Sequence, residues 1–85
     1  MNIMVTLKKI KKMNNIVSAE YFPEDKADDI GRIVYDVQKE AVVEQEYCQT
    51  DRESFLKTYF HKAISAIEKC IEKNDFPETM EYMWY

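Results

Sequence analysis

Residues 50–73 read TDRESFLKTYFHKAISAIEKCIEK, and this stretch decides the fold. Thr50 and Glu53 have the S/T-x-x-E spacing of a capping box, in which each side chain accepts a hydrogen bond from the other residue's amide. Apolar side chains then recur at steps of three and four residues, the period of a helix with one buried face: Leu56, Phe60, Ala63, Ile67 and Ile71. The sequence therefore predicts a long helix that begins near residue 51 and packs on another layer.

The sequence also indicates where this helix ends and how the tail after it behaves. Asn74 suits the left-handed position that ends many helices, and Pro77 prevents continuation. The tail, FPETMEYMWY over residues 76–85, is too aromatic for a disordered segment. We expect it to dock on the domain, and its spacing fits either a strand or a short helix.

Three alternating segments precede the helix. Residues 15–22 are rich in β-formers and end at Pro23, an acidic connector covers 24–29, and Gly31 suggests a bend or bulge. Residues 32–37 and 41–47 then alternate like the strands of a hairpin with a loop of about four residues. In the second of these strands, the expected register turns Val43 and Tyr47 inward and Val42, Glu44, Glu46 and Cys48 to the other face.

The first thirteen residues fit two structures. Ile3, Val5 and Leu7 alternate as in a strand, while Ile3, Leu7, Ile10 and Met13 have helical spacing. Residues 1–12 contain four lysines and no acid, so we interpret them as a basic arm that is either disordered or an edge strand.

These segments predict an α+β fold: a three- to four-stranded antiparallel sheet with one long C-terminal helix packed on one face. At 85 residues the chain has room for a single small domain, which we place at 1–85. A helix covers one face only, so we expect the other face, with Glu44 and Glu46, to stay solvated unless a partner or the tail covers it.

Charge is distributed unevenly along the chain. The net charge is −4, but residues 13–54 hold eleven acidic and four basic residues, which would repel a polyanion. We therefore expect no nucleic-acid partner. The sequence has neither a stretch of roughly 20 apolar residues nor the apolar region of a signal peptide, so we expect no membrane association, a cytoplasmic location and reduced cysteines.

Residues capable of catalysis or metal binding are few. His61 is the one histidine and has no acid three or four residues away on its helix. Cys48 and Cys70 lack the C-x-x-C spacing of a zinc site, and a single glycine cannot form a phosphate-binding loop. We expect no catalytic, cofactor-binding or metal-binding residues, and not an enzyme.

The aromatic tail and the uncovered sheet face favour protein binding, because Tyr and Trp are enriched at interfaces. We expect a small non-catalytic interaction module, self-associating as a homodimer or binding another protein. The candidate partner-binding residues are Tyr82, Met83, Trp84, Tyr85, Glu44 and Glu46. The alternative is an acidic inhibitor or decoy that occupies the basic groove of a nucleic-acid enzyme through Glu24, Asp25, Asp28, Asp29, Glu44 and Glu46.

Overall fold

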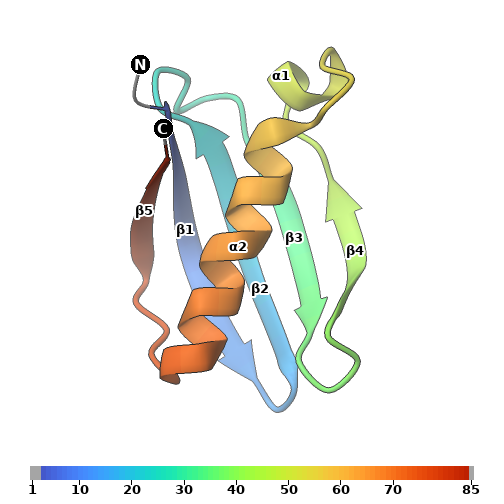
Figure 1. Ribbon diagram of the computed structural model, residues 1–85, viewed down its shortest axis with the longest axis vertical. Coiled ribbons are helices and arrows are strands. Elements are labelled where there is room, and N and C mark those ends of the chain that lie inside the picture. The colour runs from blue at the N-terminus through green and yellow to red at the C-terminus, as the bar shows by residue number, and fades with distance from the viewer. Residues whose placement is uncertain (1–2, 85) are drawn as a thin grey trace.

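The computed structural model describes residues 3–84, and it shows one five-stranded antiparallel sheet with one main helix across it (Figure 1). The elements in chain order are β1 (Ile3–Met13), β2 (Ile16–Pro23), β3 (Gly31–Asp36), β4 (Ala41–Glu46), α1 (Gln49–Arg52), α2 (Thr58–Lys73) and β5 (Thr79–Trp84). The strand order is β4-β3-β2-β1-β5. The α+β class and the antiparallel sheet are confirmed, but the sheet has five strands and β5 follows the helix.

β1 is an interior strand of this sheet, so the expectation of a disordered or edge-strand arm over residues 1–12 was wrong for the described part. It pairs with β2 on one side and with β5 on the other. The register shifts between Lys8 and Lys11, and Lys9 has a φ of 55°. This bulge adds one residue, so that Ile10 joins Val5 and Leu7 in the core. The added residue explains why the segment had a partly helical spacing.

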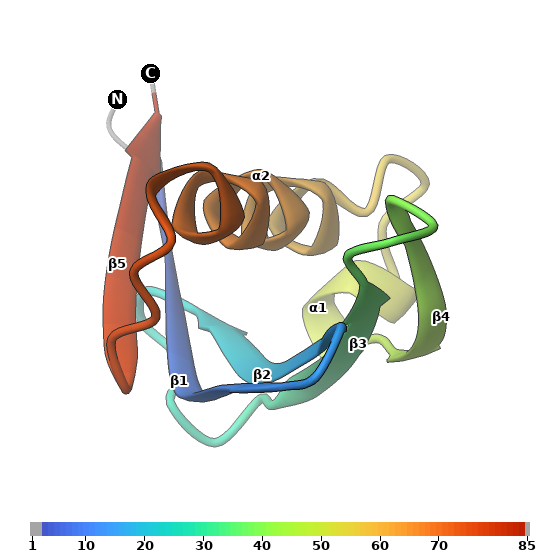
Figure 2. The same cartoon turned by 90° about the horizontal axis from the view of Figure 1, so that it is seen from below.

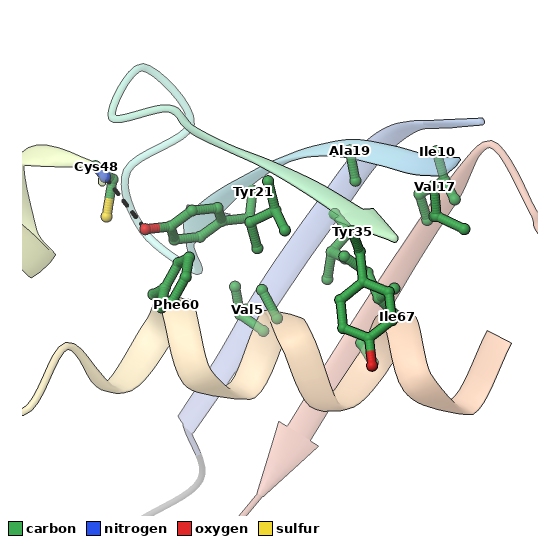
Figure 3. Packing of buried hydrophobic residues seen from close by; sticks show 13 residues of the cluster. Val5, Ile10, Val17, Ala19, Tyr21, Tyr35, Cys48, Phe60 and Ile67 are labelled. Carbon is green, nitrogen blue, oxygen red and sulfur yellow. Dashed lines mark hydrogen bonds between the residues drawn. The ribbon is translucent and has the colours of Figure 1, made fainter. Parts of the chain in front are cut away.

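The core lies between the sheet and α2, and the sheet curls around the helix so that β4 and β5 flank it (Figure 2). Alternate side chains of the strands face Phe60, Ala63, Ala66 and Ile67 of α2 (Figure 3). On the strands, the buried positions are Val5, Leu7, Ile10, Val17, Ala19, Tyr21, Ile33 and Tyr35. The apolar period of the sequence is therefore confirmed from Phe60 onward.

The predicted helix start was wrong. Residues 49–52 form the separate short helix α1, and α2 begins only at Thr58, after Lys57 adopts the left-handed conformation with a φ of 50°. Thr50 is not part of a capping box, because its hydroxyl and amide both donate to the Asp29 carboxylate, at 2.6 and 3.0 Å. Leu56 lies in the connection and is 69% exposed.

Asp51, which lies in α1, caps the start of the main helix α2. Its side chain is 0% exposed and accepts hydrogen bonds from the amides of Tyr59 (3.2 Å) and Phe60 (2.7 Å), two of the free N–H groups at the start of α2. The Tyr21 hydroxyl donates to the same carboxylate at 2.8 Å and accepts from the Cys48 amide at 3.2 Å. Burial raises the pKa of Tyr21, so its hydroxyl keeps the proton that it donates.

The β3–β4 hairpin has the expected four-residue loop, but its register differs from the prediction. Val34 pairs with Glu44 and Tyr35 pairs with Val42, which leaves Val43 as the extra residue of a bulge. Val43 is consequently 45% exposed, whereas Val42 packs against the core. Past the end of the strand, Tyr47 turns inward as expected, but Cys48, expected on the other face, is buried.

Two further sequence signals have different outcomes. Asn74 ends α2 in the left-handed conformation, with a φ of 53°, as predicted. Gly31 instead marks a close approach rather than a bend: its φ is not positive, and an added Cβ would collide with the Tyr21 ring. Glycine is required there because Tyr21 packs against the backbone.

Candidate interaction surface

The helix-free face of the sheet is formed by the side chains that alternate with the core residues. Across its middle runs a row of directly paired residues, one from each strand: Thr79, Lys8, Glu20, Arg32 and Glu46. Charges of opposite sign alternate along this row. Glu20 is 3.9 Å from the Lys8 ammonium and 3.7 Å from that of Lys9, and Glu46 is 3.8 Å from the Arg52 guanidinium. Because surface ion pairs add little stability, the row mainly makes this face polar and favours the observed strand register.

An apolar patch lies on the same face at the β5 side, and we define it as Met4, Phe22 and Met83. Met4 is directly opposite Met83 in the β1–β5 pairing, and Phe22 is opposite Thr6, one diagonal step from Met4. Met83 is 53% exposed, and Met4 and Phe22 are half-buried. The Lys8 ammonium lies 5.6 Å from the centre of the Phe22 ring. The patch therefore presents apolar surface with a cation at its border.

The sequence-predicted partner-binding residues are not gathered on one surface. Met83 belongs to the apolar patch, while Tyr82 points to the other side of β5 and packs against the core. Trp84 ends β5 but its side chain lies outside the described part, as does Tyr85. Glu44 and Glu46 are exposed on β4, at the opposite edge of the sheet. The sequence offered both groups as candidates, but without a strand order it could not show that they lie at opposite edges.

The acidic side chains also divide into two kinds. Asp29 accepts the amides of Gln49 and Thr50, at 2.5 and 3.0 Å, and Glu24 accepts the Met4 amide at 3.0 Å, so both help to hold the fold. Burial alone would raise the pKa of Asp29, but these hydrogen bonds outweigh it and the pKa lies below its usual value. Asp25 and Asp28 are exposed and border a hollow of about 550 Å³, whose lining also includes Lys26 and Glu53.

The histidine and the two cysteines lie in environments that do not activate them. His61 is exposed on α2, with its ring 5.5 Å from that of Phe60. Both cysteines are buried and reduced, and burial raises the pKa of the Cys48 and Cys70 thiols. Within residues 3–84, no three His, Cys, Asp or Glu side chains are grouped so as to hold a metal ion.

Sequence reasoning missed one exposed feature, the connection between α1 and α2. Phe55 is 97% exposed there, next to the exposed Leu56. The helical period assigned Leu56 to the buried stripe, and only the break at Lys57 shows otherwise. In the part of the chain that the structure describes, no helix combines the length and the apolar character needed to cross a membrane.

Comparisons with models of protein families, with curated proteins and with solved structures find no match to this chain.

Proposed function

We propose that the protein is a small non-catalytic interaction module that binds protein, a second copy of itself included, at the β5 side of its helix-free sheet face. The observation that carries this proposal is the apolar patch of Met4, Phe22 and Met83 beside an edge strand. Burying the apolar groups of such a surface against a partner lowers the free energy, because it removes them from water.

The state of the nucleophilic side chains supports a non-catalytic role. The two thiols are buried with raised pKa values, which suppresses the reactive thiolate at neutral pH. The exposed His61 lies beside the Phe60 ring, and among residues 3–84 no acid or nucleophile is hydrogen-bonded to its imidazole. A general base needs such a partner within hydrogen-bond reach.

Sedimentation equilibrium of the full chain at rising concentration tests the proposal, together with binding of a fluorescent apolar dye. We expect a mass that rises above the 10.2 kDa of one chain, or a monomer that binds the dye at the patch. Phe22→Lys should reduce dye binding, whereas Val43→Lys on the opposite edge should not. A monomer at every concentration that binds no dye would contradict the proposal.

The acidic hollow beside α1 favours a second function, the inhibitor or decoy for a basic groove. Asp25, Asp28 and Glu53 line this hollow, and β4 ends at Glu46, three residues before α1 begins. Binding of an arginine-rich peptide, measured at low and high salt, tests this function. Asp25→Asn with Asp28→Asn should weaken that binding, and unchanged binding would contradict it.

A further inference from the structure

The two edges of the sheet differ in how they are guarded against pairing. β4 carries a bulge at Val43 and exposed acids at Glu44 and Glu46, which are the usual features that prevent an edge from adding another strand. β5 pairs with β1 over six consecutive residues without a register shift. Its sequence, TMEYMW, has one charge and no proline. β5 is therefore the unguarded edge.

One hydrogen bond shows which residues of β5 direct their backbone N–H and C=O groups to the free edge. The Met4 amide donates to Glu24, which continues β2, so Met4 directs its N–H toward the β2 side of β1. Amides alternate along a strand, so Val5 directs its N–H toward β5, where its partner is Tyr82. The N–H and C=O groups of Glu81 and Met83 consequently point away from β1, to the free edge.

We propose that the β5 edge pairs antiparallel with β5 of a second copy of this chain, so that two sheets join into one. This inference rests on the proposed function and specifies its interface. A two-fold arrangement uses both unguarded edges at once and leaves only the guarded β4 edges outside, so the assembly closes as a dimer. Pairing of β5 with β4 of another copy would instead continue into a filament, and the bulge and acids of β4 oppose it.

The charge pattern of β5 selects the register of this pairing. Glu81 and Met83 both direct their backbone outward, so the possible registers match one odd-numbered residue with another. A two-fold axis at Tyr82 places Glu81 opposite Met83 of the partner copy, which keeps the two carboxylates apart. An axis at Glu81 would set the only charge of the strand against itself.

The expected strength of the dimer follows from its size. A single strand edge with the adjoining Met83 side chain is smaller than the roughly 800 Å² per partner that stable interfaces bury. We therefore expect a dimer that forms and dissociates with concentration in the micromolar range.

Sedimentation equilibrium of matched variants of the full chain tests the edge pairing. Glu81→Pro removes an outward N–H but no N–H of the β1–β5 ladder, and Glu81→Thr removes the same charge while keeping that N–H. We expect Glu81→Pro to weaken dimerisation at least about tenfold and Glu81→Thr to dimerise at least as well as the unmodified chain. Circular dichroism checks that each variant is folded.

A second pair of variants keeps the test decisive if Glu81→Pro does not fold. Met83→Glu places a carboxylate opposite Glu81 of the partner copy in the proposed register, and Val43→Glu makes the same kind of change at the exposed bulge of β4. Only Met83→Glu should produce a monomer, because the partner's Glu81 repels it. A dimer that persists in Glu81→Pro and in Met83→Glu would overturn the edge pairing but leave self-association in place. An unmodified chain that stays monomeric but binds the apolar dye would also overturn the edge pairing, and it would not contradict the proposed interaction module.

Discussion

Asp51 is the residue that most changes how the sequence is interpreted. In the sequence it looks like one of many acids, yet it is fully buried and accepts three hydrogen bonds, from β2 and from the start of α2. A buried carboxylate persists only where donors compensate its lost hydration. Asp51 therefore joins the sheet to the helix at one end of the core.

Replacing Asp51 should be costly. Asp51→Ala leaves the Tyr21 hydroxyl and the Tyr59 and Phe60 amides without their acceptor, and we expect a loss of about 3 kcal/mol in the free energy of unfolding. Glu53→Ala, at an exposed position two residues later, should change it by less than about 0.5 kcal/mol. Urea unfolding measures both. Equal stabilities of the two variants would show that the buried network does not hold the helix.

Asp29 should make stability depend on pH in the acidic range. Its pKa in the folded chain lies below the unfolded value of about 3.9, so its stabilising contribution is complete above that pH and is lost as the pH falls through the folded value. Asp29→Asn should therefore unfold about 1 kcal/mol more easily near neutral pH, and the difference should shrink below about pH 4. Urea unfolding at several pH values checks this, and a constant difference would refute it.

At the scale of elements, the start of α2 gives a direct test of the helix boundary. Because Leu56 lies exposed before the helix and Phe60 is buried in it, Leu56→Lys should change the free energy of unfolding by less than about 0.5 kcal/mol. Phe60→Ala should cost about 3–5 kcal/mol. Thermal or urea unfolding compares them. A large loss from Leu56→Lys would indicate the continuous helix that the capping box predicted.

The bulge in β4 makes an equally specific prediction. Val42 packs against the core opposite Tyr35, whereas Val43 is the exposed extra residue. Val42→Lys should therefore destabilise the fold by about 1–3 kcal/mol, and Val43→Lys should be nearly neutral. If the order of the two effects were reversed in urea unfolding, the register without a bulge would be correct.

The elements that could be predicted from the sequence are those whose signals are local. The apolar period from Phe60 to Ile71, the cap at Asn74 and the alternation in residues 15–22 and 32–37 each reflect the geometry of one element. The helix start could not be predicted, because Thr50 bonds to the distant Asp29 instead of forming a capping box, and Asp51 accepts from the free amides of α2. The bulges at Lys9 and Val43 could not be predicted either, and one added residue inverts the inward and outward alternation of the residues that follow.

For the whole molecule, strand order decides what the surface can do. The sequence indicated acidic and aromatic candidates for binding, and the structure places Glu44 and Glu46 at one edge and Met83 at the other. That separation depends on β1, which lies inside the sheet and carries β5 on its outer side. One edge is thus acidic and bulged, while the other is regular and adjoins the apolar patch.

Amide hydrogen exchange of the unmodified chain, followed residue by residue at low and high protein concentration, tests the central claim that β5 is the edge through which the protein binds itself. The amides of Glu81 and Met83 point outward from β5, so their exchange should slow markedly as the concentration rises, while that of Gln45, which alternation places on the outer side of β4, stays fast. Exchange at Glu81 and Met83 that is fast and independent of concentration would contradict the claim.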